Sequence, residues 1–494
     1  MIVLGIDLGT SAIKLSLIDQ TLQQVASASA PVASKFPFDG ASEQEATDWW
    51  DALLVAVETL AANAPRHWAS VKAIGLSGQM HGAVMLGADD VPVAPVILWN
   101  DGRAAPQCAE FEERLPAITD IASIRPLAGF TAPKLMWMKE HRPDLHAQIR
   151  SVMLPKDYLG LRLHGQKVTD PSDAAGTHWF DQSARKWSEE ACLASDTDPA
   201  WLPRIVSGSD IAGHLLAAPA KALGLPAGLP VAAGGGDAAT GAVGIGAVRE
   251  GRSFISLGTS GQIFVATDSY RPNPLGMIHA YAHTVPDTWF QMAAMLNGAS
   301  PMAWFAGVCK ADIGVLLEEA AAAEEARTPD ALPYLTGERT PHGDSAIRAA
   351  FYGMDAATTR GEMMRAVVRA ISFSFADAAE ALAVGGTQLQ SPLAIGGGAK
   401  SNLLMQMIAD GLQVEIRRVA GAGTGPAVGA ARLAAVANGL ASAGDLDCSP
   451  QVERVFEPGR EYAGLRTTAL RRYRALYTSM SALNATGTEK SPDP

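Results

Sequence analysis

The sequence predicts an α/β protein made of two similar domains, and two observations support this. Short apolar runs typical of strands alternate along the 494 residues with segments that keep helical spacing. The tetrapeptide Leu8-Gly9-Thr10-Ser11 returns as Leu257-Gly258-Thr259-Ser260, about half a chain later. Each copy separates two strand-like runs, so we expect two domains that each contribute one polar hairpin.

The individual elements follow from the same patterns. The hairpin strands are expected at 2–6 and 13–18 in the first domain, and at 254–256 and 263–266 in the second. Further strands are expected at 71–76 and 96–99, and helices at 50–61, 403–412 and 430–436. Ser42-x-x-Glu45, just before the first helix, has the spacing of a capping box.

The chain divides best near residues 248–251, directly before the second hairpin. We therefore predict a first domain at 1–248 and a second domain at 249–480. The polar end, 481–494, is expected to be a flexible tail.

Composition excludes several classes of protein. The 39 Lys and Arg against 51 Asp and Glu give a formal charge of −12, which disfavours nonspecific nucleic-acid binding. The four cysteines are far apart, without zinc-site spacing, which fits a reducing compartment. The beginning of the chain does not resemble a signal peptide, and we find no apolar stretch of about 20 residues. We expect a cytoplasmic protein that binds neither nucleic acid nor membranes.

Asp237 is the only charged residue between Lys221 and Arg249, and it follows three glycines. It could be the N-cap of the Ala- and Val-rich helix that follows. It could also be a carboxylate that a strand-to-helix turn directs into a cleft, where it acts as a general base. Both can hold, because capping uses one oxygen and leaves the other.

Asp7 and the two hairpins suggest phosphate chemistry. Asp7 lies at a strand end, where it is either a simple turn residue or a ligand of a hydrated Mg²⁺. Glycine lets backbone N–H groups approach phosphate oxygens, and hydroxyl groups donate further hydrogen bonds. The candidate phosphate-binding residues are Gly9, Thr10 and Ser11 in the first hairpin, and Gly258, Thr259 and Ser260 in the second.

Two other segments carry polar groups at predicted strand ends. The turn at 395–402 fits neither the Rossmann nor the P-loop motif, but a glycine-rich strand-to-helix turn suits nucleotide phosphates or the face of a sugar. The segments 77–83 and 97–103 bring together His81, Trp99 and Asp101, which suit a polyol. His81 could equally be a hydrogen-bonded histidine of the core.

The motifs DLGTS, LGTSG, GGGD and GGGAxSN together resemble the FGGY carbohydrate kinase family, over residues 2 to about 477. The resemblance implies two actin/Hsp70/hexokinase-like (ribonuclease H-like) domains with a cleft between them. The fragments SGQMHGA, ILWNDGR, GFTAPKL, LPKDYL, SDAAGT and LPYLTGERTPH are most similar to members that phosphorylate xylulose.

The resemblance also implies roles for single residues. Asp237 would be the catalytic base, and with Asp7 it would lie near the metal and the phosphates. Met80 and His81 would contact the sugar, Asp101 would be the partner of a sugar hydroxyl, and Trp99 would lie beside it. The nucleotide would be bound by the two hairpins and by Gly397, Gly398 and Asn402.

The implied reaction is ATP- and Mg²⁺-dependent phosphorylation of D-xylulose to D-xylulose 5-phosphate, with the sugar on the first domain and the nucleotide on the second. The alternatives are a related kinase that acts on ribulose, fuculose, gluconate or glycerol, and a regulatory ATP-binding protein on the same fold. The expected partners are the sugar and ATP, and a homodimer is one expected assembly.

Overall fold

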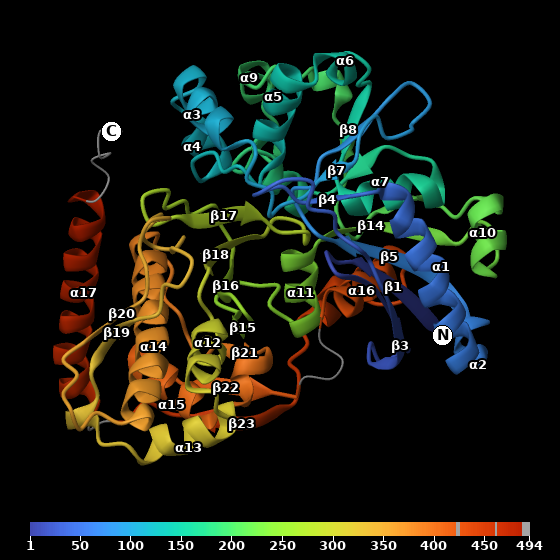
Figure 1. Ribbon diagram of the computed structural model, residues 1–494. Helices are drawn as coiled ribbons and strands as arrows, with labels where there is room; N and C mark the ends of the chain where they lie inside the picture. The colour runs from blue at the N-terminus through green and yellow to red at the C-terminus, as the bar shows by residue number, and fades with distance from the viewer. Residues whose placement is uncertain (421–424, 460–461, 487–494) are drawn as a thin grey trace.

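The computed structural model describes residues 1–420, 425–459 and 462–486. It contains two lobes, each built around a mixed β-sheet with helices packed against it (Figure 1). This confirms the two-domain α/β fold expected from the sequence.

The N-terminal lobe is built on a six-stranded sheet. The strands of this sheet lie in the order β13 (Ile211–His214), β14 (Pro230–Gly236), β5 (Val71–Gly78), β1 (Ile2–Leu8), β2 (Ala12–Ile18) and β3 (Gln24–Pro31). Strand β1 pairs in parallel with β5 and antiparallel with β2, and β5 pairs in parallel with β14. The first predicted hairpin is therefore β1–β2, at the centre of the sheet.

The C-terminal lobe repeats this arrangement. The strands of its sheet lie in the order β17 (Ile278–Ala282), β18 (Trp289–Met295), β16 (Gly261–Thr267), β15 (Ser253–Leu257), β21 (Leu393–Ile395), β22 (Ile416–Val419) and β23 (Val452–Phe456). Strand β15 pairs antiparallel with β16 and in parallel with β21, which pairs in parallel with β22. The series β3-β2-β1-β5-β14 thus matches β18-β16-β15-β21-β22, so the repeated tetrapeptide marks a repeated fold.

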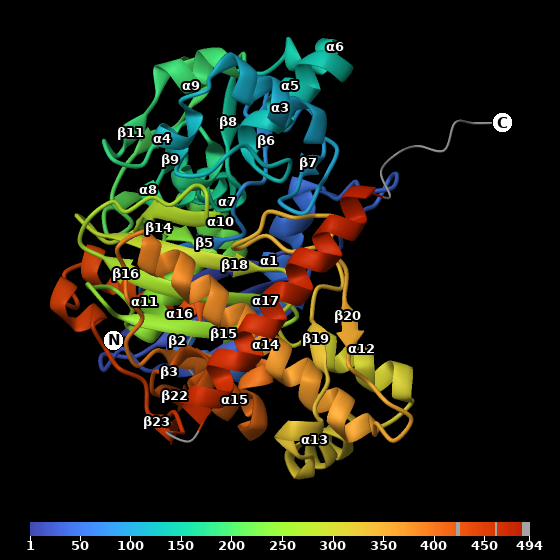
Figure 2. The ribbon, with the colours of Figure 1, turned by 90° about the vertical axis from the view of Figure 1, so that its left-hand side faces the viewer.

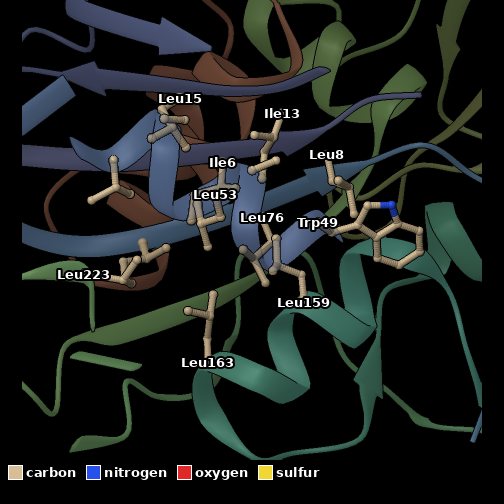
Figure 3. Close-up of a cluster of buried hydrophobic side chains, with 14 of the residues drawn as sticks. Ile6, Leu8, Ile13, Leu15, Trp49, Leu53, Leu76, Leu159, Leu163 and Leu223 are labelled. Carbon is tan, nitrogen blue, oxygen red and sulfur yellow. The ribbon is translucent and has the colours of Figure 1, made fainter. Parts of the chain in front are cut away.

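The N-terminal sheet buries one face against α1 (Ala46–Asn63), α7 (Pro155–His164) and α10 (Ala217–Leu223). Alternate residues of a strand face one side of a sheet, and here Ile6 and Leu8 of β1 share that side with Ile13 and Leu15 of β2 (Figure 3). Trp49 of α1 packs against the same cluster. The opposite face of β1 carries Val3, Gly5 and Asp7.

That opposite face is covered by α16 (Pro426–Ala437), which follows β22 of the C-terminal lobe in the chain (Figure 1). Glycines allow the close approach: a Cβ on Gly5 would lie 1.8 Å from the carbonyl oxygen of Ala427, and one on Gly75 would lie 1.9 Å from that of Ala430. Helix α11 (Asp237–Ile245), which leads from the N-terminal to the C-terminal lobe, packs against α16.

The C-terminal sheet packs against α14 (Arg360–Val384), which in turn contacts α15 (Asn402–Leu412) and α17 (Tyr462–Thr486). Figure 2 shows α14 and α17 running diagonally in front of this sheet. Helices α12 (Ser300–Cys309) and α13 (Ile313–Ala322) complete the lobe. Within the described ranges, no single helix is long and apolar enough to span a membrane, although α12 and α13 pass as a pair bent by 98°.

The remaining elements are short. The helices are α2 (Pro65–Trp68), α3 (Ala105–Arg114), α4 (Ile118–Ala122), α5 (Thr131–His141), α6 (Pro143–His146), α8 (Pro171–Ala174), α9 (Glu189–Ala194) and the 3₁₀ helices η1 (Ala175–Thr177), η2 (Pro199–Trp201), η3 (Glu325–Arg327), η4 (Gly397–Lys400) and η5 (Ala443–Leu446). The strands are β4 (Glu43–Gln44), β6 (Val84–Leu86), β7 (Val96–Ile97), β8 (Ser151–Met153), β9 (Val168–Thr169), β10 (Phe180–Asp181), β11 (Lys186–Trp187), β12 (Arg204–Ile205), β19 (Asp330–Leu332) and β20 (Ala350–Tyr352).

Two local predictions differ from the structure. The capping box at Ser42 is wrong, because Glu45 is the N-cap of α1 without a side-chain bond, and residues 43–44 form strand β4 paired with β7. Part of the predicted tail is helical, because α17 continues through 481–486, where Asn484 donates to the carbonyl oxygen of Ala346. The rest of that tail, 487–494, lies outside the described residues.

Candidate active site

Asp237 lies where β14 ends and α11 begins. Gly236 is the N-cap of α11, so Asp237 is the first helical residue rather than the cap, one position later than the capping interpretation placed it. The glycines before it allow close packing, since a Cβ on Gly236 would lie 2.7 Å from Cγ of Met80. The sharp strand-to-helix turn therefore holds the carboxylate at the end of the sheet.

The surroundings of Asp237 favour its protonated form. Burial raises its pKa to about 7, the negative charge of Asp7 adds to the increase, and a hydrogen bond from the backbone N–H of Ala238 opposes it. Near neutral pH such a carboxylate exists in both forms, which is the condition for efficient proton transfer.

Asp7 is buried, at the end of β1 and on the face that α16 covers. Burial raises its pKa, while a hydrogen bond from Ser77 and the charge of Lys14 lower it. The Ser77 hydroxyl lies 2.9 Å from Oδ1 of Asp7 and 2.7 Å from Oγ1 of Thr240, whose hydroxyl donates to the carbonyl oxygen of Gly236 at 3.0 Å. A chain of hydroxyl groups thus connects the carboxylate of Asp7 to the backbone of the turn that precedes Asp237.

A cavity of about 250 Å³ connects Asp237 to the C-terminal lobe. Its lining includes Asp237 and Gly241 from the N-terminal side, and Ser256, Gln262 and Ile395 from the C-terminal side. A second cavity, of about 430 Å³, contains Asp7 and Lys14, and both cavities border residues 425–426 at the start of α16. The candidate base therefore faces strands that carry the second hairpin and the third glycine-rich turn.

Met80 and His81 lie on the other side of the Gly236–Asp237 turn. Met80 is buried and packs against Gly236 and Gly176. Nδ1 of His81 lies 2.7 Å from the carbonyl oxygen of Gly176, so Nδ1 carries the proton and Nε2 is the acceptor in the neutral ring. Burial lowers the pKa of His81 to about 3, which keeps the ring neutral at physiological pH.

The backbone of His81 is held by a buried lysine. His81 has a φ of +70°, in the left-handed region that residues other than glycine rarely adopt. Its carbonyl oxygen accepts hydrogen bonds from Nζ of Lys134 at 2.8 Å and from Oγ1 of Thr131 at 3.2 Å. Burial lowers the pKa of Lys134 well below its ordinary value. The aromatic ring of Phe130 lies 4.1 Å from the imidazole and supports it from one side.

Trp99 and Asp101 have different environments although they are close in sequence. Trp99 is 43% exposed and donates from its indole nitrogen to Oγ1 of Thr10 at 2.9 Å, beside the first hairpin. Both oxygens of Asp101 are already hydrogen-bonded, by Arg103 and by the backbone N–H of Ser42. Its side chain is fully buried, so the structure does not present Asp101 to a sugar.

The three predicted phosphate-side turns lie in two groups. In the second hairpin, Gly258, Thr259 and Ser260 are exposed, and the carbonyl oxygens of Gly258 and Thr259 accept backbone bonds from Ala299 and Gly298. The third turn packs beside it, since a Cβ on Gly396 would lie 2.6 Å from the carbonyl oxygen of Leu257. The members of this turn are Gly397, which is exposed, Gly398, which is buried, and Asn402, whose Oδ1 accepts from Arg418 at 3.0 Å. The first hairpin, with Gly9, Thr10 and Ser11, stands on the N-terminal lobe.

Sequence reasoning missed the residues that support this site. Ser77, Lys134 and Ser172 make buried hydrogen bonds to it from elements far apart in the chain. All three lie in segments that resemble the family, but nothing in their local sequence shows that their side chains face inward.

Comparison with known proteins agrees with this arrangement. The N-terminal domain model of the FGGY family of carbohydrate kinases matches residues 2–244, and the C-terminal domain model matches residues 253–438. The chain therefore belongs to the FGGY family of carbohydrate kinases and is a sugar kinase, which confirms the resemblance found in its motifs. Membership of a kinase family implies ATP as a substrate.

Individual relatives within the family indicate which sugar kinases the chain is similar to. The chain is 40% identical over 438 residues to the xylulose kinase of Escherichia coli, covering 88% of this chain and 90% of that one. It is 34% identical over 495 residues to the xylulose kinase of Bacillus subtilis, with 98% of each chain covered. A crystal structure of a xyloylose kinase from Brucella ovis is similar with a TM-score of 0.95 and 39% identity, covering 98% of this chain and 100% of that one.

Proposed function

We propose that this protein transfers the γ-phosphoryl group of ATP to O5 of D-xylulose, giving D-xylulose 5-phosphate and ADP. The observation that carries the proposal is the position of Asp237: its half-buried carboxylate lines a cavity between the two lobes, and its pKa is raised to about 7. The xylulose kinases at 34–40% identity over most of the chain support the choice of sugar.

Asp237 is the general base of the reaction. Its carboxylate takes the proton of the attacking hydroxyl group as the oxygen forms a bond to the γ-phosphorus and the bond from that phosphorus to the bridging oxygen of ADP breaks. A positioned base contributes about 10²- to 10⁴-fold to the rate of such a step. Because the transition state is loose, positioning and charge stabilisation supply the rest.

Met80, His81 and Trp99 form the sugar side of the site. In the neutral ring, Nε2 of His81 accepts a hydrogen bond from a sugar hydroxyl, because Nδ1 already donates to Gly176. Met80 and the half-exposed indole of Trp99 provide apolar surfaces for the C–H groups of the sugar. Asp101 is not part of this proposal, because its oxygens are occupied by Arg103 and Ser42.

The hairpins and the third turn bind the nucleotide, the first hairpin from the N-terminal lobe and the other two elements from the C-terminal lobe. Exposed backbone N–H groups and hydroxyls at Gly258, Thr259 and Ser260 suit phosphate oxygens. Gly398 and Asn402 then lie on the nucleoside side. Closure of the lobes excludes water, which would otherwise compete as the phosphoryl acceptor.

Mg²⁺ fits at Asp7 and Asp237. The described residues contain no group of three or more His, Cys, Asp or Glu that could hold a metal, but Mg²⁺ in kinases takes one or two carboxylates together with waters and phosphates. Burial raises the pKa of both carboxylates, and the charge of Asp7 adds to the increase at Asp237, so a bound dication would favour their ionised forms. When bound, the ion would neutralise charge on the phosphates.

The direct test is ADP release by the wild type and by Asp237→Asn with D-xylulose, D-ribulose or glycerol as acceptor. We expect D-xylulose to give the largest kcat/KM and Asp237→Asn to lose about 10²-fold or more in kcat, because the base is gone. Normal turnover by the variant would refute the role of Asp237, and a preference for another acceptor would refute the choice of sugar.

Stability against pH provides the folding control for this variant. The raised pKa of Asp237 means that the folded state keeps a proton that the unfolded state has lost between about pH 4 and 7. The contribution of Asp237 to the free energy of unfolding therefore falls as the pH rises through this window, and Asp237→Asn lacks this contribution. The variant should be more stable at pH 8 by about 1 to 3 kcal/mol, with no such advantage at pH 4, as urea unfolding would measure.

A further inference from the structure

Residues 170–177, which form α8 and η1, contact both parts of the site. Oγ of Ser172 accepts a hydrogen bond from the backbone N–H of Gly236 at 3.1 Å, directly before Asp237. The carbonyl oxygen of Gly176 accepts from Nδ1 of His81 at 2.7 Å. One short segment, which we call the bracket, therefore holds the candidate base and the candidate sugar ligand at the same time.

The bracket is anchored by a buried ionic cluster. Asp170 caps α8, with Oδ2 accepting from the backbone N–H of Ser172 at 2.8 Å and from its hydroxyl at 2.5 Å. The Nζ atom of Lys156 lies 3.1 Å from Oδ1 of Asp170 and 3.4 Å from Oδ2 of Asp173, and it also pairs with Asp157. The side chains of this cluster are 0–3% exposed.

A buried ionic cluster of this kind is not expected to stabilise the fold more than apolar side chains would. Taking one cation and three carboxylates out of water costs more than their attraction returns, and well-packed apolar residues are often more stabilising. Burial raises the pKa of Asp173 well above its ordinary value. Among the described residues, Oδ1 of Asp173 has no hydrogen-bond partner, and Oδ2 has the 3.4 Å ion pair with Lys156. What the cluster does supply is a rigid link, from Lys156 through Asp170 and Ser172 to the turn at Gly236.

The packing between the bracket and the site leaves no free space. A Cβ on Gly235 would lie 2.9 Å from Oγ of Ser172, and one on Gly176 would lie 2.3 Å from Nδ1 of His81. Met80 fills the space between, with Cε 3.2 Å from the Cβ position of Gly176. A displacement of the bracket would therefore move the turn, the imidazole or both.

We propose that residues 170–177, anchored by Lys156, are a positioning device that fixes the distance between the carboxylate of Asp237 and the imidazole of His81. This inference rests on the function proposed above. It makes Lys156, Asp170 and Ser172 positioning residues, since none of them needs to touch the sugar or ATP. The bracket contacts the site at two points: Ser172 binds the turn that holds the base, and Gly176 binds the imidazole that faces the sugar. Disrupting each contact should therefore change a different kinetic constant.

The test is steady-state kinetics of two variants with D-xylulose and ATP. Ser172→Ala removes the acceptor of the Gly236 N–H group, so we expect kcat to fall about 10- to 100-fold with KM for the sugar within about twofold, because misplacement of a catalytic group costs this much. Gly176→Ala displaces the imidazole, so we expect KM for D-xylulose to rise about tenfold or more, with a smaller change in kcat.

Ser374→Ala is the matched control, because Ser374 is a buried serine of α14 whose hydroxyl donates to the carbonyl oxygen of Ile371 at 2.8 Å, away from the site. It should lower the melting temperature and leave kcat and KM unchanged. Lys156→Met leaves the carboxylates without their cation, so we expect it to lower the melting temperature and, in the protein that folds, to lower kcat as Ser172→Ala does.

Normal kcat in a folded Ser172→Ala variant, or loss of stability without any change in kcat or KM in both variants, would overturn the inference. If Asp237→Asn is inactive and Ser172→Ala is normal, the bracket fails and the proposed function stands. If Asp237→Asn is fully active, both fail. Gly176→Ala decides the matter alone if Ser172→Ala does not fold.

Discussion

In the N-terminal lobe, Leu8-Gly9-Thr10-Ser11 follows a buried carboxylate, whereas Leu257-Gly258-Thr259-Ser260 in the C-terminal lobe follows a half-exposed serine. Strand pairing is the same around both, with an antiparallel partner on one side and a parallel partner on the other. The same backbone arrangement therefore presents a carboxylate in one lobe and a neutral hydroxyl group in the other. The difference lies in the residue before each tetrapeptide, which is Asp7 in the first lobe and Ser256 in the second.

The hydroxyl groups of the two hairpins differ as well. Oγ1 of Thr10 donates to Gln79 at 3.0 Å and accepts from Trp99 at 2.9 Å, so it is part of the N-terminal lobe. Within the described part of the chain, the hydroxyl group of Thr259 makes no hydrogen bond, and Thr259 is exposed. The hydroxyl of Thr259 is thus free to bind a ligand, whereas the hydroxyl of Thr10 is already hydrogen-bonded within the N-terminal lobe.

The largest effect that this comparison predicts is at Asp7. We expect Asp7→Asn to lower kcat about 10²-fold or more, because it removes a fixed charge beside the reacting phosphates. Ser256→Ala, the same position in the other hairpin, should change kcat less than about tenfold, since it removes only an uncharged hydroxyl group from the cavity wall. Initial rates at saturating ATP and D-xylulose measure both, and equal losses would contradict the division of roles.

A smaller effect is expected from Gly298, which supports the second hairpin. A Cβ there would lie 2.2 Å from the carbonyl oxygen of Ser260, so Gly298→Ala must displace the hairpin. We expect kcat/KM for ATP to fall about tenfold or more. Gly307→Ala in α12, where nothing lies within 4 Å of the Cβ position, is the control and should be neutral or slightly stabilising. Unchanged ATP kinetics in Gly298→Ala would show that the hairpin does not bind the nucleotide.

The smallest expected effects are those of Thr259→Ala and Thr10→Ala, and the two variants should differ in kind. Thr259→Ala should raise KM for ATP a few-fold through loss of one hydrogen bond to phosphate, and leave the melting temperature unchanged. Thr10→Ala should reduce the free energy of unfolding by about 1 to 2 kcal/mol, because the indole N–H of Trp99 and Gln79 lose their partner. Thermal unfolding with and without ATP distinguishes these outcomes, and the reverse pattern would contradict the comparison.

Local sequence was sufficient for the parts of the molecule that depend on local chemistry. The hairpin strands, the glycine-rich turns and the helices expected at 403–412 and 430–436 follow from apolar periodicity and turn residues. In the structure these helices are Asn402–Leu412 and Pro426–Ala437, so the second begins four residues earlier than expected. A capping box was expected at Ser42, but β4 pairs with β7 there, a contact between segments about 50 residues apart. Pairing of distant segments overrides such local signals.

The site was predictable only in part, for the same reason. Asp237 could be found because a single charge in a long neutral stretch needs an explanation, and Asp7 because it precedes a polar hairpin. The sequence could not show whether Asp101 faces a sugar. Asp101 pairs with Arg103, two residues away, and from the sequence either side chain could have been the one that contacts the sugar. Lys134 and Lys156 are fully buried, and a lysine in a predicted helix normally faces water.

The position of α16 limits how the two halves can be used separately. This helix belongs to the second half of the chain, yet its backbone rests on glycines of the first half's sheet. A fragment cut at residue 248 would expose an uncovered apolar and glycine-lined surface on its central strands, and we expect it to aggregate. The two halves consequently cannot be exchanged independently between related kinases. In a chimaera, β1, β5 and α16 should come from the same parent protein.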